Sequence, residues 1–279
     1  MGRFPPIQAH FRPAARHYNC LFVFRALAQV GDRLPKGWGD LGRQIGILIV
    51  VDLVYEVCRG LADSKRADAM AHGQWIIDLE RSTHTFFEVD MQAFFSADWI
   101  VDFANQIYLN AQFSVALGFL FWLYLFRNES FYFVRNMFVV SMGLALIGYT
   151  LYPTAPPRMF PEYGFVDTIN DFSHVNHDSG LAKILINPYA AVPSMHCAFA
   201  MMIGASAFKV CRTSVAKAFW AAWPFLVAWV TIVTANHYWV DVVLGWGVAL
   251  AAALAAQRLA RRRPEAWAFR TRVPREAEA

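Results

Sequence analysis

The sequence is poor in charged residues. Only 16% of its 279 residues are Asp, Glu, Lys or Arg, whereas 57% are hydrophobic. Ordinary soluble proteins carry about 25% charged and roughly 45–50% apolar residues. A soluble domain of this length needs more polar surface, and a disordered chain needs fewer apolar residues. The composition excludes both classes and predicts an integral membrane protein.

Cysteine is also scarce. Four cysteines are too few for a disulfide scaffold, and their spacing resembles no metal site, so we interpret them as buried free thiols. The net charge of +4 is divided between two ends of the chain that flank apolar segments, which does not favour nucleic-acid binding. These features predict no metal site, and we expect no cofactor and no nucleic-acid partner.

The sequence contains long runs without charged residues. A helix that crosses a bilayer needs about 20 mostly apolar residues. Four runs have 22 to 25 residues without Asp, Glu, Lys or Arg. A fifth run, 242–257, reaches the length of a span if His237 and Asp241 belong to its helix. A sixth candidate, 44–59, contains Asp52 and Glu56. The sequence predicts an all-α bundle of six transmembrane helices over residues 44–59, 103–126, 136–157, 184–208, 218–240 and 242–257.

The distribution of basic residues orients this bundle. With both termini in the cytoplasm, 19 of the 25 Lys and Arg residues fall on cytoplasmic segments, as the positive-inside rule requires. We divide the chain into a basic cytoplasmic or interfacial segment (1–40), a membrane-embedded domain (41–257) and a basic cytoplasmic tail (258–279). Residues 62–98 are expected to form an amphipathic helix outside the cytoplasm.

Three short motifs lie at the extracytoplasmic ends of these spans. The third span ends in the proline-rich Tyr152-Pro-Thr-Ala-Pro-Pro-Arg158. The fourth contains Val192-Pro-Ser-Met-His196, and the sixth begins with Asn236-His-Tyr-Trp-Val-Asp241. The predicted topology places all three on one side of the membrane at similar depth.

The residue types in these motifs suit phosphate chemistry. His237 and Asp241 are four residues apart and share a helix face, where the carboxylate fixes one imidazole nitrogen and leaves the other as base or nucleophile. Pro193 suits the first position of a helix, whose free N–H groups bind anions. Arg158 offers a planar cation to phosphate oxygens. We also expect Gly245 to admit a neighbouring helix closely.

Simpler interpretations exist for each residue alone. An arginine at a membrane edge commonly snorkels to the surface, and Ser194 has the residue type of a helix cap. Asp52 and Glu56 are either structural groups or carboxylates on a substrate path. The combination of the three motifs favours a phosphate pocket that contains two histidines.

The same residues resemble the type 2 phosphatidic acid phosphatase superfamily. Pro193-Ser-Met-His196 resembles its second signature, Pro-Ser-Gly-His, and His237-Tyr-Trp-Val-Asp241 resembles the end of its third. The stretches 152–158 and 187–196, with Asn236-His-Tyr, are more similar to the inositol phosphorylceramide synthase-like (inositolphosphotransferase) branch. The resemblance covers roughly residues 41–257 and implies a metal-independent six-helix fold with an extracytoplasmic catalytic face.

The resemblance also implies roles for individual residues. His237 corresponds to a nucleophile that forms a phosphohistidine, and Asp241 to the group that orients it. His196 corresponds to the acid that protonates the leaving alkoxide. Arg158 and Ser194 correspond to the phosphate-binding residues.

Two departures from the family pattern bear on the substrate. The family has a lysine where this chain has Leu151, and an arginine where it has Thr231. Fewer cations suit a phosphodiester donor, with one negative charge, better than a monoester, unless Lys183 or backbone amides compensate. We therefore expect a phosphotransferase that uses a phosphatidylinositol-type donor and a lipid alcohol acceptor.

Two alternatives stay open at this stage. One is a phosphatase of the same superfamily that hydrolyses lipid phosphates or polyprenyl diphosphates. The other is an ion-coupled transporter with a path through Asp52, Glu56 and Asp241, although the sequence lacks the internal repeat common in transporters. The donor headgroup, the acceptor and the oligomeric state do not follow from the sequence.

Overall fold

The computed structural model describes residues 31, 34–60, 66–169 and 189–262. Within these ranges the chain is helical and contains no strand, which confirms the all-α prediction. Short 3₁₀ and π segments, labelled η, interrupt the α-helices. The elements are α2 (Gly37–Gly60), α3 (Arg66–Ser82), α4 (Glu88–Phe94), α5 (Asp98–Asn110), η2 (Ala111–Val115), α6 (Ala116–Phe126), α7 (Asn128–Leu151), η3 (Pro157–Met159), η4 (Pro161–Tyr163), α10 (Met195–Val210), α11 (Ser214–Val233) and α12 (Trp239–Arg262).

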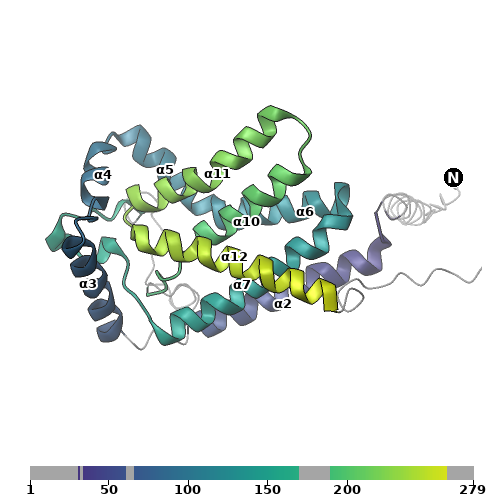
Figure 1. Cartoon of the computed structure of the whole chain (residues 1–279), viewed down its shortest axis with the longest axis horizontal. Coiled ribbons are helices and arrows are strands. Elements are labelled where there is room, and N and C mark those ends of the chain that lie inside the picture. The colour runs from purple at the N-terminus through teal and green to yellow at the C-terminus, as the bar shows by residue number, and fades with distance from the viewer. Residues whose placement is uncertain (1–30, 32–33, 61–65, 170–188, 263–279) are drawn as a thin grey trace, which may run out of the picture.

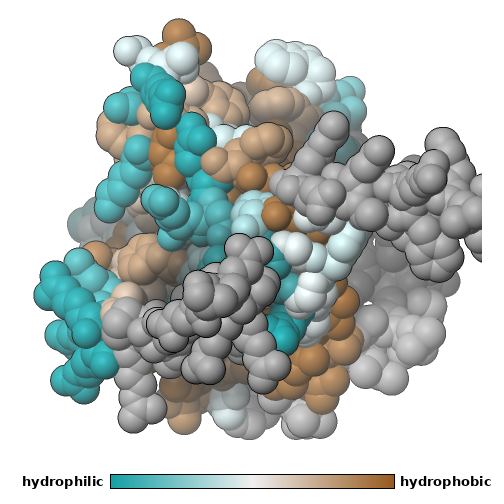
Figure 2. All heavy atoms as spheres, turned by 90° about the vertical axis from the view of Figure 1, so that its right-hand side faces the viewer, coloured by the Kyte–Doolittle hydropathy of each residue, from teal (hydrophilic) through white to brown (hydrophobic). Residues whose placement is uncertain are grey.

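The long helices form an elongated bundle (Figure 1). Helix α10 packs against α7, α11 and α12, and α2 packs against α7. Helices α3 and α4 lie together at one end of the bundle, where α12 begins. Figure 2 looks onto the opposite end, where hydrophilic surface lies beside hydrophobic surface. Helices α3 and α4 therefore mark one end of the bundle.

Within the described ranges, four helices are long and apolar enough to cross a membrane. They are Asp98–Phe126, which joins α5, η2 and α6, together with α7, α11 and α12. The predicted span 184–208 corresponds to α10, a shorter apolar helix of 16 residues, and residues 184–188 lie outside the described residues. The predicted span 44–59 lies in α2, which carries Asp52 and Glu56 and is not among the four. Six spans and cytoplasmic termini stay predictions.

The predicted boundaries of the third span, 136–157, are wrong at both ends. Helix α7 begins at Asn128 because Arg135 lies inside the bundle and not in a loop. Arg135 is only 1% exposed, and its guanidinium donates hydrogen bonds to Gln44 of α2 and to Asn136. The helix ends at Leu151, before Pro153, because a residue that precedes proline disfavours helical geometry.

The starts of α10 and α12 also differ from prediction. Ser194 is the N-cap of α10, and its hydroxyl accepts the N–H of Cys197 at 3.3 Å, so Pro193 precedes the helix and is not its first residue. Helix α12 begins at Trp239. His237 therefore lies just before the helix that carries Asp241, and the two do not share a helix face.

The end segments of the predicted organisation are described only in part. Residues 1–30, 32–33 and 263–279 lie outside the described residues, so most of the predicted N-terminal segment and of the predicted tail is not tested. Helix α12 continues through the first part of that tail, to Arg262.

Candidate active site

Backbone hydrogen bonds tie the three motif segments together at the end of the bundle that carries α3 and α4. The segment before η3 pairs with the segment before α10, η3 is bonded to the turn before α12, and the start of α10 is bonded to the first turn of α12. The bonds run from Thr154 N to Tyr189 O (2.8 Å), Ala191 N to Thr154 O (3.3 Å), Arg158 N to Ala235 O (2.8 Å) and Ser194 N to Asp241 O (3.2 Å). Segments that lie 30 to 80 residues apart in sequence thus form one rigid site.

Helices α10 and α12 approach so closely that only glycine fits between them. A Cβ atom on Gly245 would lie 2.3 Å from the carbonyl oxygen of Ser194 and 3.3 Å from the backbone nitrogen of Ala198. The predicted close approach at Gly245 is confirmed. This contact fixes the distance between the two helices one turn beyond Asp241.

His237 is held in a tight turn between α11 and α12. The carbonyl of Thr231 accepts the N–H groups of Asn236 (3.1 Å) and His237 (3.2 Å), and Ala235 adopts a positive φ of 50°. The imidazole is 5% exposed. The turn therefore presents a buried histidine with a fixed backbone.

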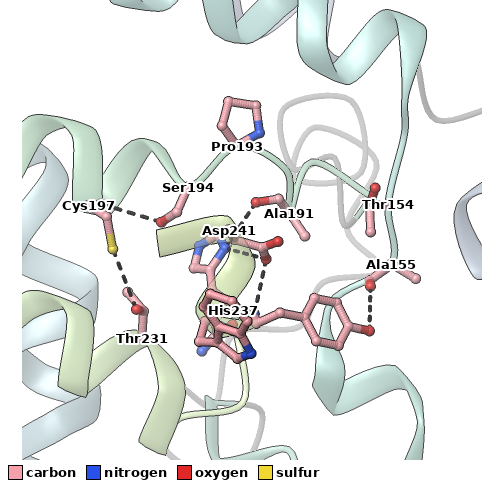
Figure 3. Close-up of polar contacts among 12 residues, drawn as sticks. Thr154, Ala155, Ala191, Pro193, Ser194, Cys197, Thr231, His237 and Asp241 are labelled. Atoms are coloured by element: carbon pink, nitrogen blue, oxygen red, sulfur yellow. Dashed lines mark hydrogen bonds and ion pairs between the residues drawn. The ribbon is translucent and has the colours of Figure 1, made fainter. Parts of the chain in front are cut away.

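The Nδ1 atom of His237 faces two oxygen atoms (Figure 3). It lies 3.0 Å from the carbonyl oxygen of Ala191 and 3.3 Å from Oδ2 of Asp241. Burial, followed by the positive charge of Arg158, lowers the pKa of His237 to about 3, and the Ala191 carbonyl opposes this shift. The ring is therefore neutral near pH 7. Because Nδ1 faces two acceptors, it carries the proton, and the lone pair lies on Nε2.

Asp241 is fully buried and holds the start of its own helix. Its Oδ2 accepts the backbone N–H of Tyr238 at 3.0 Å as well as facing His237. A side chain in the first turn that accepts the N–H of the residue before the helix stabilises that helix start. Among the described residues, no donor reaches the other oxygen, Oδ1. Asp241 thus links the orientation of His237 to the start of α12.

His196 lies in the first turn of α10, beside His237. The centroids of the two rings are 5.8 Å apart, with an interplanar angle of 58°. The His196 ring stacks on Tyr108 of α5, at 4.2 Å and 19°, and is partly exposed. The site thus contains one buried histidine and one that is more accessible.

Arg158 is positioned in η3 by the residue next to His237. Its guanidinium donates to the side-chain oxygen of Asn236, and its Nε lies 3.6 Å from Oδ2 of Asp167. The Asn236 amide in turn donates to the carbonyl oxygen (3.1 Å) and hydroxyl oxygen (2.9 Å) of Thr234. The cation is therefore fixed close to His237. The phosphate-binding roles of Arg158 and Ser194 stay predictions.

The two departures from the family pattern occupy different environments. Leu151, at the end of α7, is 75% exposed. Thr231 is fully buried, and its hydroxyl donates to the carbonyl of Ala228 at 2.9 Å. Neither position brings a charge to the site. Lys183 lies outside the described residues.

Residues 66–98 contact the segments that carry the site, a role that the sequence did not indicate. The predicted single amphipathic helix is two helices, α3 and α4. His72 of α3 stacks on Tyr152 at 3.9 Å and bonds the Pro153 carbonyl at 2.7 Å. Gln92 of α4 donates to the carbonyls of Val166 (2.9 Å) and Val233 (3.1 Å). These helices fix the loops that carry Arg158 and His237.

Helices α3 and α4 also contain two carboxylic acids that were not predicted to lie near the site. Glu80 of α3 and Glu88 of α4 are fully buried, and Oε1 of Glu88 accepts the N–H of Trp239 at 3.1 Å. A signal was present in the sequence, since Glu80 follows Gly73, Ile76 and Ile77 at the spacing of one helix face. All three of these residues are buried with it.

A comparison with protein families identifies the chain. The family model described as "PAP2 superfamily" matches residues 74–255, which include His237, His196, Asp241, Arg158 and Ser194. No curated protein and no solved structure matches the chain significantly. Together with its apolar helices, this match identifies the chain as a membrane protein that belongs to the PAP2 superfamily, with a function of the lipid phosphatase or phosphotransferase type.

Proposed function

We propose that the protein is a membrane phosphotransferase that moves a phosphorylated headgroup from a phosphatidylinositol-type lipid to a lipid alcohol. The observation that carries the proposal is the contact of His237 Nδ1 with the oxygen atoms of Ala191 and Asp241. Its Nδ1 proton is held by Ala191 and Asp241, and its low pKa leaves Nε2 unprotonated. A neutral imidazole fixed in this tautomer is an activated nucleophile.

In the first step, Nε2 of His237 attacks the phosphorus atom of the donor. A P–N bond forms while the bond from phosphorus to the glycerol oxygen of the donor breaks. His196 gives its proton to the departing oxygen, and diacylglycerol leaves. Arg158 stabilises the phosphate oxygens, and Asp241 stabilises the positive charge that develops on His237.

In the second step, the acceptor alcohol attacks the phosphohistidine. His196, now neutral, takes the proton of the attacking hydroxyl, while the P–N bond breaks and returns the electron pair to Nε2. The phosphodiester product leaves with both histidines in their starting states. Every proton transfer passes through a side chain, and no step is assigned to a metal.

The small number of positively charged side chains at the site supports a diester donor. Arg158 is the cation whose charge acts on His237, whereas Leu151 and Thr231 contribute none. A phosphodiester carries one negative charge near neutral pH, and a monoester carries nearly two. One arginine and the N–H groups at the start of α10 suit the smaller charge.

We place this chemistry on the extracytoplasmic face of a six-span protein with cytoplasmic termini. The distribution of basic residues supports this topology. The site lies at one end of the long helices, next to α3 and α4, and this end is the one that the topology puts outside.

The test uses purified protein in mixed micelles with phosphatidylinositol labelled in its headgroup and a panel of lipid alcohols. The wild type and the exposed-surface control His84→Asn should move the label to one acceptor, and His237→Ala should not. Label released as a water-soluble phosphate indicates the hydrolase alternative. Full turnover by His237→Ala contradicts the mechanism.

A further inference from the structure

Glu80 and Glu88 are two buried acids near the start of α12 that influence each other. Both side chains are 0% exposed, although they come from helices outside the long bundle, and the proposed reaction does not use them. Burial of an ionised carboxylate is costly unless it is paired with donors or cations. The bonding partners of each acid therefore show which charge state it holds.

Glu88 has the partners of an ionised carboxylate. Its Oε1 accepts the N–H of Trp239, the first residue of α12, at 3.1 Å, and its Oε2 accepts the N–H of Phe87 at 3.0 Å. Its position at the N-terminus of α12 also favours a negative charge. Burial raises the pKa of Glu88, and these two N–H groups oppose the shift.

Glu80 has the surroundings of a protonated acid. Within the described part of the chain, no donor meets either of its oxygen atoms in hydrogen-bonding geometry. Burial first, then the negative charge of Glu88, a hydrogen bond to Glu88 and the charge of Asp241 raise the pKa of Glu80 to about 10. The N–H of Val240, in the first turn of α12, opposes this shift only in part, because it does not reach hydrogen-bonding geometry with Glu80. A hydrogen bond between two carboxyl groups requires a proton on one of them. Both oxygen atoms of Glu88 already accept backbone N–H groups, so Glu80 carries the proton.

The acids that face this pair make a second ionisation unfavourable. Asp241 contributes negative charge from α12. Burial, followed by the negative charges of Asp241, Glu80, Glu88 and Glu162, raises the pKa of the Tyr238 hydroxyl. Neighbouring carboxylates in a dry site cannot all ionise.

We propose that Glu80 and Glu88 share one proton and act as positioning residues, because the carboxyl–carboxylate pair fixes the first turn of α12 and, through it, Asp241 and His237. The catalytic part of this proposal rests on the proposed function. The shared proton does not, since it concerns the folded protein without substrate.

The proposal predicts how stability depends on pH. Between the ordinary pKa of 4.5 and the folded value of about 10, the folded protein keeps a proton on Glu80 that the unfolded chain has lost. The contribution of this site to the free energy of unfolding therefore falls as the pH rises from 4.5 to about 10. Glu80→Gln keeps a donor for Glu88 but cannot ionise, so it removes this fall.

The first experiment measures the unfolding midpoint in micelles from pH 5 to pH 10. Glu80→Gln should flatten the decline with pH and unfold at a higher temperature than the wild type at pH 8 and above. The control Asp78→Asn changes an exposed carboxylate of the same helix and should follow the wild type. A Glu80→Gln protein that keeps the wild-type slope, or is less stable at pH 8, overturns the shared proton.

The second experiment follows turnover of labelled phosphatidylinositol. In Glu88→Gln, one of two backbone N–H groups loses its acceptor, so kcat should fall about tenfold with KM unchanged. Glu80→Gln should keep kcat near neutral pH and lose less of it than the wild type at alkaline pH. If both variants match the wild type in kcat at every pH, the positioning role is wrong. If no variant and no wild type turns over any lipid phosphate while the stability difference holds, the proposed function fails and the shared proton stands.

Discussion

The contact between Gly245 and Ser194 leads to a quantitative prediction. A methyl group on Gly245 would lie 2.3 Å from the Ser194 carbonyl oxygen, and ordinary van der Waals contact begins at 3.4 Å. In Gly245→Ala, α12 therefore has to move away from α10 by about 1.1 Å. Overpacking of this kind costs about 1–3 kcal/mol of stability, and a 1 Å misplacement of reacting groups lowers the rate about 100-fold.

Gly247 provides a matched control in the same helix. A Cβ atom on Gly247 would meet no atom within 4 Å, and alanine is favoured over glycine in a helix by up to about 1 kcal/mol. Gly247→Ala should therefore keep the wild-type unfolding midpoint, or raise it, and keep kcat. Thermal unfolding and turnover of labelled phospholipid measure both effects. A Gly245→Ala protein with wild-type stability and kcat, or equal losses in the two variants, refutes this account of the helix contact.

Three further predictions concern the cation, the nucleophile and the topology. Asn236→Ala removes the acceptor that positions Arg158 and should lower kcat/KM by the equivalent of about 1.5–3 kcal/mol, measured in micelles. Nitrogen NMR of labelled histidine should show that His237 is neutral at pH 5 with its proton on Nδ1, because its folded pKa is about 3. A histidine with the ordinary pKa of about 6.5 is mostly charged at that pH. A cysteine at position 84 should react with an impermeant maleimide in intact cells, and Cys211 only after permeabilisation.

Each of these predictions has a result that contradicts it. Unchanged kcat/KM in Asn236→Ala means that Arg158 does not depend on this contact. A His237 resonance that titrates near pH 6.5 contradicts the buried neutral nucleophile, and the resonance is assigned by its loss in His237→Ala. Labelling of Cys211 from outside reverses the proposed topology.

The convergence of the three motifs was predictable from the sequence, whereas their exact placement was not. Alternating apolar spans and the distribution of basic residues put the motifs on one side of the membrane, and Gly245 indicated a close helix contact. The shared helix face of His237 and Asp241 was wrong, because Thr231 holds His237 in a turn before the helix. Arg135 was assigned to a loop because the predicted spans were limited to runs without charged residues, whereas the structure buries this arginine within α7.

The contacts that helices α3 and α4 make could not be predicted from local sequence patterns. The importance of these helices arises from contacts between residues about 75 to 150 positions apart, such as Gln92 with Val166 and Glu88 with Trp239. Amphipathic periodicity predicts that a helix buries one face, but not which loop that face meets. Glu80 lay on the apolar face, and this mismatch was the one local sign of the acidic pair.

The most direct test of the central claim is the capture of the covalent intermediate. Wild-type protein is mixed with donor lipid labelled in its phosphate, quenched in alkali during turnover, and digested for mass spectrometry. We expect label that is stable to alkali and labile to acid on the peptide that contains His237, and no label in His237→Ala. Label on a different residue, or turnover by the wild type with no labelled protein under single-turnover conditions, contradicts the account.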